Sequence, residues 1–302
     1  MNYSISTTRS LAKFLTALES RNPDAIEFLS LLEKPNTAAK RIGITGPPGT
    51  GKSTLVNEMC KYLAHLNQKI GVLAVDPSSP FTNGAILGDR VRMTELSKVE
   101  NVFVRSIASR GHLGGLSAQT GYMADALEVA GYDWILIETV GIGQSELEIA
   151  DHCDCVIVVL NPESGDGIQA MKAGLIEIAN IFVVNKSDHQ NTENFINQME
   201  MILNIQLKME GWNPQIVKTI ATKSIGINEV FDLVSLFYSE KGKTGEIEME
   251  KRRKKISILK NQINDLIVNE FWTDKRIDEL SHLDGNRSAS NVQSILKELK
   301  NK

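Results

Sequence analysis

Cysteines, long apolar runs and a strong net charge are all scarce in this 302-residue chain. Its three cysteines cannot form a disulfide framework, and they favour a reducing compartment. No apolar run approaches the roughly 18–20 residues that span a bilayer. The N-terminal residues also lack the continuous apolar core of a signal peptide. The net charge of −4 gives no electrostatic reason to expect a nucleic-acid partner.

These absences predict a protein of the cytoplasm, or of the mitochondrial matrix if the source is eukaryotic, that binds neither membranes nor nucleic acids. The apolar fraction of 42% and the charged fraction of 23% are typical of a soluble globular protein. A chain of 302 residues is long enough for one large α/β domain with appendages, or for two domains.

The apolar pattern divides the chain into three parts. Residues 1–40 have helical spacing and predict an N-terminal helical extension. Residues 41–242 alternate short apolar runs with helical segments, which predicts an α/β domain with a doubly wound, mostly parallel sheet. Residues 243–302 predict helices, the first of them long and amphipathic. The expected strands are 41–46, 69–76, 101–108, 133–139, 155–161, 181–186 and 215–221, and the expected helices between them are 52–66, 116–130, 167–179, 191–207 and 226–240.

The strongest motif is GPPGTGKST, which satisfies G-x-x-x-x-G-K-[ST] between an expected strand and an expected helix. Its glycines let backbone N–H groups converge on phosphate oxygens, and the helix N-terminus adds a positive dipole. We expect Lys52 to reach the β- and γ-phosphates and Ser53 to ligate Mg²⁺. The predicted phosphate-binding residues are Gly46, Gly49, Thr50, Gly51, Lys52, Ser53, Thr54 and Gly141.

The motif VVNKSD ends a later expected strand in Asn-Lys-x-Asp and predicts guanine as the base. Guanine presents a ring N–H beside an exocyclic amine, and the Asp188 carboxylate can accept from both. Adenine has an acceptor in place of the ring N–H and would leave the carboxylate unpaired. We expect the Lys186 stem to lie along the base, Asn185 to tie this loop to the phosphate loop, and the backbone at Ala221 and Thr222 to cover the guanine oxygen.

Three carboxylates are predicted to lie near the metal. Asp76 ends an expected strand, Asp89 sits in a glycine-flanked loop, and Glu138 ends the strand expected beside that of the phosphate loop. Mg²⁺ keeps several waters and takes few protein carboxylates. We therefore expect Ser53, Asp76, Asp89 and Glu138 to form the metal shell, directly or through water, and Lys52 and the three carboxylates to form the catalytic set.

The segment ETVGIGQSE resembles the phosphate sensor Asp-x-x-Gly of nucleotide switches, with Glu138 in place of the aspartate. Gly141 would offer its amide to the γ-phosphate. Ile142 holds the position where a glutamine often orients the attacking water, and Gln144 lies two residues further on. The sequence therefore predicts slow intrinsic GTP hydrolysis that a partner accelerates.

Several motifs together resemble one family, the MeaB/ArgK-type GTPases. The most specific are SRGHLGGLS and ETVGIGQSE, joined by TGPPGTGKST, LAVDPSSP, GAILGDRVRM, GDGIQAMKAG and VVNKSD, and the resemblance covers residues from about 10 to 240. It implies a homodimeric chaperone that hydrolyses GTP and gates the loading of adenosylcobalamin into an acyl-CoA mutase, chiefly methylmalonyl-CoA mutase. Such a chaperone also protects or reactivates the mutase.

The resemblance further implies Mg²⁺ with GTP or GDP as ligand, no tightly bound cobalamin on this chain, and a C-terminal dimerisation arm. It also implies mobile switch segments near 77–92, 139–147 and 162–172. The last of these departs from the Gly-Asp-Glu-Leu-Gln of methylmalonyl-CoA mutase partners, so the partner mutase stays open. Ile220 stands where the family often has serine.

Two other functions are compatible with parts of the sequence. A metallochaperone GTPase would need a ligand cluster, and His152, Cys153 and Cys155 offer only one short group, with both cysteines entering a buried strand. A kinase acting on a small molecule or a transport protein is disfavoured by the guanine-reading Asp188 and by the lack of an obvious acceptor site.

Overall fold

The computed structural model describes most of the chain and separates it into two compact units, residues 1–251 and 252–302. The described residues are 3–33, 35–77, 96, 98–109, 118–139, 145–163, 174–206 and 212–281.

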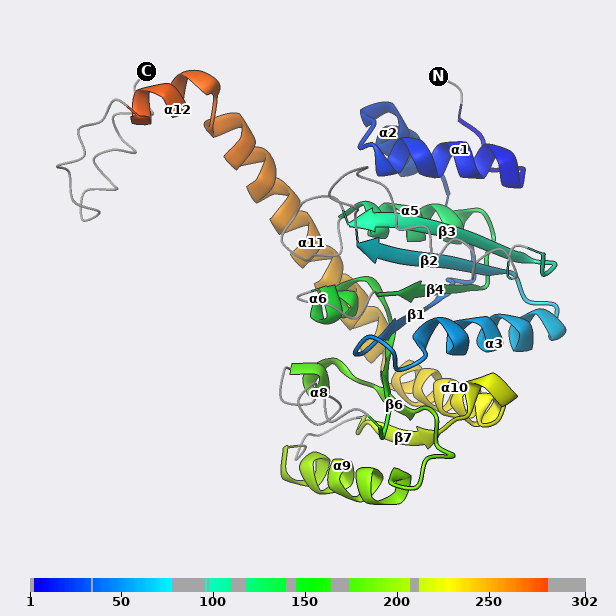
Figure 1. Cartoon of the computed structure of the whole chain (residues 1–302). Helices are drawn as coiled ribbons and strands as arrows, with labels where there is room; N and C mark the ends of the chain where they lie inside the picture. Colours follow the sequence, from blue (N-terminus) through cyan, green and yellow to red (C-terminus); the bar gives the residue numbers. More distant parts are fainter. Residues whose placement is uncertain are drawn as a thin grey trace. The chain divides into compact units, whose positions relative to one another are not determined.

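Seven parallel strands form one sheet in the order β3-β2-β4-β1-β5-β6-β7 (Figure 1). Every pairing between neighbouring strands is parallel, so the doubly wound sheet predicted from the alternating pattern is confirmed. The strands are β1 Lys40–Thr45, β2 Ile70–Pro77, β3 Val102–Ser109, β4 Trp134–Glu138, β5 Cys155–Leu160, β6 Ile181–Val184 and β7 Gln215–Lys218.

Helices cover both faces of the sheet, which is why the strands are continuous apolar runs. The sheet has an apolar core on each face, and alternate residues of β4 pack into opposite cores. Leu136 packs with α3 and α10, whereas Ile135 and Ile137 pack on the opposite face. On that second face, Gly43 of β1 approaches Ile149 so closely that an added Cβ would lie 2.8 Å from its Cγ1. The helices of this domain are α3 Lys52–His65, α5 Ala118–Val129, α6 Ser145–His152, α8 Ile176–Ile178, α9 Thr192–Gln206 and α10 Ile227–Thr244.

Two N-terminal helices, α1 Thr8–Glu19 and α2 Pro23–Leu31, join the core on the α5 side of the sheet. A capping box between Thr7 and Ser10 begins α1. Phe14 is fully buried and meets the ring of Phe28 edge to face, with ring centroids 5.3 Å apart. The Arg105 guanidinium of β3 also reaches Glu19 at 2.5 Å. The extension is therefore integrated into the fold by apolar and charged contacts.

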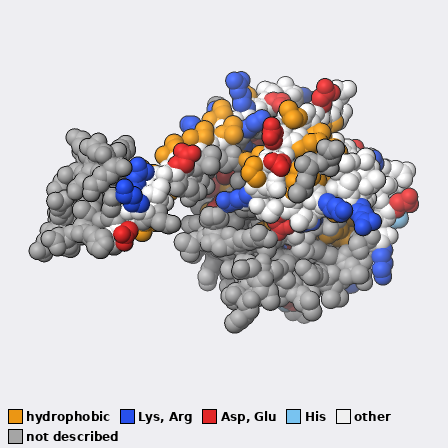
Figure 2. Space-filling model, turned by 90° about the horizontal axis from the view of Figure 1, so that it is seen from above, with side chains coloured by type: hydrophobic (Ala, Val, Ile, Leu, Met, Phe, Trp, Pro, Cys, Tyr) orange, Lys and Arg blue, Asp and Glu red, His pale blue; other side chains and the backbone are white. Residues whose placement is uncertain are grey.

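Two helices follow α10: α11 Glu246–Phe271, which begins in the first unit and continues in the second, and α12 Asp274–Ser281. The exposed large apolar side chains of α11 include Ile256, Leu259, Ile263 and Ile267. Apolar side chains also lie between charged ones on the face of the molecule that Figure 2 shows. Among the described residues, no helix is both long enough and apolar enough to cross a membrane.

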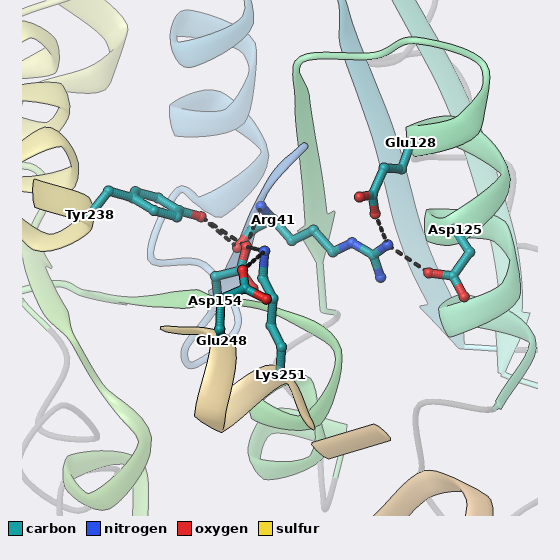
Figure 3. Close-up of polar contacts among 7 residues, drawn as sticks. All are labelled: Arg41, Asp125, Glu128, Asp154, Tyr238, Glu248 and Lys251. Atoms are coloured by element: carbon teal, nitrogen blue, oxygen red, sulfur yellow. Dashed lines mark hydrogen bonds and ion pairs between the residues drawn. The ribbon is translucent and has the colours of Figure 1, made fainter. Parts of the chain in front are cut away.

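A partly buried ion-pair cluster holds the amino end of β1 (Figure 3). The Arg41 guanidinium donates to Asp125 of α5 at 2.6 Å and also to Glu128. Burial alone would lower the pKa of Arg41, but the two carboxylates more than offset that effect and raise it. The cluster therefore fixes the strand that leads into the phosphate loop against α5.

Asp154 connects three more elements at the same end of β1. Its carboxylate accepts from the backbone N–H of Arg41 at 3.2 Å and from the Tyr238 hydroxyl of α10 at 3.3 Å, and Lys251 of α11 lies 3.6 Å away. Burial, together with the charge of Asp154, raises the pKa of Tyr238 well above its ordinary value. The first turns of α11 are thus tied to the domain that carries the phosphate loop.

Candidate functional site

The phosphate loop lies between β1 and α3, and its glycines are required by its backbone. Gly46, Gly49 and Gly51 all have positive φ angles, of 132°, 77° and 95°. A Cβ at Gly46 would lie 2.2 Å from the Val159 carbonyl oxygen, and one at Gly51 would lie 2.3 Å from Nδ2 of Asn185. A side chain would clash at Gly46 and Gly51, and at Gly49 the positive φ favours glycine, so the loop can present its backbone N–H groups inward.

Lys52, at the start of α3, folds back over this loop. Its Nζ donates to the Gly46 carbonyl at 2.8 Å and to the Pro47 carbonyl at 3.0 Å. Thr50 Oγ1 donates to the Pro47 carbonyl at 2.9 Å as well. The side chain of Lys52 is buried, and the loop arches around a single positive charge. This arrangement suits a polyphosphate.

Ser53 and Glu138 form the part of the site that suits a metal ion. The parallel register places Glu138 of β4 opposite Ile44 of β1. Ser53 Oγ donates to Glu138 Oε1 at 2.6 Å, and Glu138 is only 9% exposed. A hydroxyl and a carboxylate oxygen at this distance are the hard ligands that Mg²⁺ takes, so the donor set fits the ion.

Two further ionisable groups interact with charged residues of the site. Glu146, in the first turn of α6, is half-buried, and that burial raises its pKa although the charge of Lys52 opposes the change. Burial, and secondly the negative charge of Glu138, raises the pKa of the Cys60 thiol. The Cys60 thiol therefore stays protonated and acts as part of the core.

Three of the predicted groups lie where their side chains are not described. Asp76 belongs to β2, whose Ala74 pairs with Glu138, but its own side chain is outside the described set. Asp89 and Gly141 lie outside the described residues altogether.

One amide links the phosphate loop to the base-binding side. Asn185 is buried and donates from Nδ2 to the Thr50 carbonyl at 2.9 Å. Its Oδ1 accepts from the Ala221 backbone N–H at 3.0 Å and from Thr219 Oγ1 at 3.1 Å. A single side chain thus fixes the spacing between the loop after β1, the loop after β6 and the loop after β7.

The remaining base-side residues lie at the same edge of the sheet. Lys186 has a positive φ of 56° and pairs with Glu163 at 3.4 Å. Asp188 pairs with Lys223 at 3.2 Å, and this hydrogen bond holds the pKa of the Asp188 carboxyl below its ordinary value. Thr222 lies between Ala221 and Lys223 in the 3₁₀ helix η2 Ala221–Lys223.

A cavity of about 490 Å³ adjoins the phosphate loop. The loop residues, Glu138 and Lys186 form part of its wall. Another part is apolar and includes Val56 of α3, Val72 and Val75 of β2, Val104 of β3, and Leu96. The sequence predicted the polar wall from motifs. The apolar wall was missed, because nothing in a buried strand shows which of its residues will border a cavity.

A second connection to the base loop was also missed. Ser224 Oγ donates to Glu58 Oε2 of α3 at 2.5 Å, and Glu58 also pairs with Lys61. Gly226 then starts α10 with a φ of 83°, where an added Cβ would lie 2.2 Å from the Lys218 carbonyl oxygen. The glycine in IGINEV was a usable signal for a fixed loop, whereas the Glu58 contact joins residues 166 positions apart and has no local pattern.

The DHCDC segment does not assemble a metal site in the part of the chain that the structure describes. There, no group of three or more His, Cys, Asp or Glu side chains is placed to hold an ion. Cys153 and Cys155 are free and buried. Cys153 packs close to Gly43 of β1, as a core residue does.

An all-parallel sheet with a glycine-rich loop after β1, and an Asn-Lys-x-Asp loop at the same edge, defines a P-loop protein of the GTPase class. Comparison with known proteins narrows this class. The sequence profile of the family described as methylmalonyl Co-A mutase-associated GTPase MeaB matches residues 11–276. The chain belongs to this family.

Individual relatives agree with this assignment. A putative GTPase of Pyrococcus horikoshii is 42% identical over 256 residues, which cover 82% of this chain and 79% of the relative. The GTPase ArgK of Escherichia coli is 34% identical over 276 residues, 89% of this chain and 83% of ArgK. A crystal structure described as an LAO/AO transport system kinase superposes with a TM-score of 0.74 at 26% identity, covering 98% and 93% of the two chains.

Proposed function

We propose that this protein is a GTP-hydrolysing chaperone that gates adenosylcobalamin loading into a cobalamin-dependent acyl-CoA mutase and protects or reactivates that enzyme. The observation that carries the nucleotide part is the Asn185 side chain, which bonds the phosphate loop and the base loop at once. The mutase part is supported by membership of a family described as associated with methylmalonyl Co-A mutase.

In this proposal the phosphates bind across the loop from Gly46 to Thr54. The Gly49, Gly51 and Thr54 backbone N–H groups and the Lys52 ammonium neutralise the triphosphate. Ser53 and Glu138 would hold Mg²⁺, together with Asp76 and Asp89. When bound, the ion neutralises charge that develops on the β- and γ-phosphate oxygens.

The base would be read at the other side of the site. Asp188 accepts from the guanine ring N–H and the exocyclic amine, and the Lys186 stem lies along the ring. The backbone at Ala221 and Thr222 covers the guanine oxygen. ATP is then disfavoured, because adenine leaves the Asp188 carboxylate without its donors.

Hydrolysis by the isolated chain is predicted to be slow. Ile142 occupies the position at which a glutamine orients water in many switches, and Gly141 senses the γ-phosphate. A partner would complete the site and raise the rate. Single-turnover GTP hydrolysis measures this rate in the protein alone, and a value near that of fully assisted GTPases would refute the prediction.

We further propose that the chain works as a homodimer through residues 243–302, in the cytoplasm or the mitochondrial matrix, and that it carries no tightly bound cobalamin. The exposed apolar side chains of α11 support the dimer, because a long helix with one apolar stripe gains stability by packing that stripe against another surface. The mutase is methylmalonyl-CoA mutase or a related acyl-CoA mutase.

The two alternatives have less support. A metallochaperone is disfavoured by the burial of Cys153 and Cys155, which removes the most suggestive ligand group. The other alternative, a transport-associated kinase, is supported only by the description of the related crystal structure as a transport system kinase. Membership of a GTPase family and the Asn-Lys-x-Asp loop favour hydrolysis of GTP over transfer to an acceptor.

The test combines two readouts on one set of samples. The protein is mixed with candidate adenosylcobalamin-dependent mutases, and complex formation and GTP turnover are measured together. We expect a complex and accelerated turnover with one of them. If no cobalamin mutase binds or accelerates turnover, the chaperone role is removed and the GTPase assignment is left intact.

A further inference from the structure

The residue that pairs with Asp188 belongs to the loop that covers the base. Lys223 is the last residue of η2, and its Nζ donates to Asp188 Oδ2 at 3.2 Å. Both side chains are about half exposed, at 59% for Lys223 and 49% for Asp188. The ion pair therefore lies at the open rim of the base site and does not form part of the core.

The loop beneath Lys223 is held at several points. The Ala221 N–H is bound by Asn185, and the Lys223 N–H donates to the Ile220 carbonyl at 2.9 Å. The next residue, Ser224, is bound to Glu58 of α3. With its backbone fixed in this way, the long Lys223 side chain is the part that can change position when a base enters.

The hydrogen-bonding capacity of the Asp188 carboxylate explains how its pairing with Lys223 can affect binding of the base. An ionised carboxylate has two oxygens and accepts only. Guanine presents two adjacent donors and so uses both oxygens, whereas hypoxanthine has only the ring N–H and uses one. A lysine ammonium on Oδ2 takes one of the two lone-pair positions of that oxygen and part of its negative charge, so it weakens a base donor bound to Oδ2 and has less effect on a donor bound to the other oxygen.

We propose that Lys223 is a specificity-setting residue, which shares the Asp188 carboxylate with the incoming base and so limits how tightly, and how selectively, guanine nucleotides are held. This inference rests on the proposed role of Asp188 in reading guanine. The Lys223 hydrogen bond also lowers the pKa of the Asp188 carboxyl, as expected for a paired carboxylate. The pairing would favour exchange of nucleotide over its retention.

The chain offers a matched control for this lysine. Lys218 of β7 pairs with Glu193 at 2.9 Å, and these side chains are 51% and 75% exposed. The pair has the same chemistry and similar exposure, but neither residue belongs to the proposed base site. Lys218→Met therefore removes an equivalent exposed ion pair without freeing Asp188.

The experiment titrates full-length protein with GDP and with IDP, the hypoxanthine analogue, in the presence of magnesium. For Lys223→Met we expect the dissociation constant for GDP to fall by about two- to five-fold, the scale of an exposed ion pair, and that for IDP to change little. Lys218→Met should behave as the wild type with both nucleotides. Thermal unfolding of each variant checks that the fold is unchanged.

Unchanged or weaker GDP binding by Lys223→Met, at wild-type stability, overturns this inference while leaving guanine recognition in place. An equal gain for GDP and IDP overturns it as well, because competition for the second oxygen would then play no part. A wild-type chain that binds neither nucleotide removes the proposed function itself, a result that cannot be confused with the other two.

Discussion

At the scale of single residues, the site depends on side chains that make several bonds at once. Asn185 joins three loops, Lys52 bonds two carbonyls of its own loop, and Ser53 meets Glu138 across two elements. The sequence pointed to each of these residues because its motif has a fixed spacing. It gave no sign of Lys223, because the pairing of Lys223 with Asp188 depends on how two loops meet.

Asn185→Ala tests this linkage. The substitution leaves the buried Thr50 carbonyl and Ala221 N–H without their partner, and each such loss costs about 1–3 kcal/mol. We expect a lower free energy of unfolding in urea together with weaker GDP binding. The control is Asn191→Ala, which alters an exposed asparagine six residues away. If Asn185→Ala matched this control in both measurements, the linking role would be wrong.

At the scale of elements, the central strands were predictable because they are apolar runs covered on both faces. The strand β7 at the sheet edge is less apolar, and only its Val217 is buried. Most helices also begin and end within about two residues of their predicted bounds. Two fully described helices of this domain are exceptions. The helix α6 Ser145–His152 was not among the expected helices, and α10 continues to Thr244 instead of ending near 240 and is capped by Gly245 with a φ of 72°. Gly242 lies within the last turns of this helix.

A further helix differs more from its predicted bounds. The helix expected over 167–179 is described only as the short α8 Ile176–Ile178, because residues 164–173 lie outside the described part of the chain. Long-range charge pairs could not be predicted either. Arg41 meets Asp125 and Glu128 across more than 80 positions, and only the order of strands and helices brings them together.

The N-terminal extension yields a prediction at this scale. Phe14 of α1 is fully buried among side chains of α1, α2 and α5, so Phe14→Ala should lower the free energy of unfolding by about 3–5 kcal/mol. Leu31 of α2 is 76% exposed, and Leu31→Ala should change the free energy of unfolding by less than about 0.5 kcal/mol. Chemical denaturation measures both. Equal effects of the two variants would mean that α1 contributes little to the core.

At the scale of the whole molecule, the chain consists of two compact units, and the second contains most of α11. The domain with the parallel sheet holds every described residue of the proposed nucleotide site. The second unit has exposed apolar side chains and a small aromatic group in which Phe271 and Trp272 meet edge to face. This division of features agrees with one unit for the nucleotide and another for assembly.

Ile263 of α11 tests the proposed assembly. It is 54% exposed, and a charge placed there would disfavour burial of the stripe against a second copy. We expect sedimentation velocity to show a dimer for the wild type, and a shift toward monomer for Ile263→Asp. Lys255→Ala, which alters a charged residue of the same helix, should stay dimeric. A wild-type chain that sediments as a monomer at high concentration would contradict the dimer.

The central claim is that one edge of the sheet grips a triphosphate and selects its purine through Asp188. Calorimetric titration of the purified protein with GTP and with ATP, each with magnesium, tests it most directly. The account predicts saturable GTP binding, with ATP weaker by about 100-fold or more. Equal affinity for the two nucleotides, or no binding of either, would contradict it.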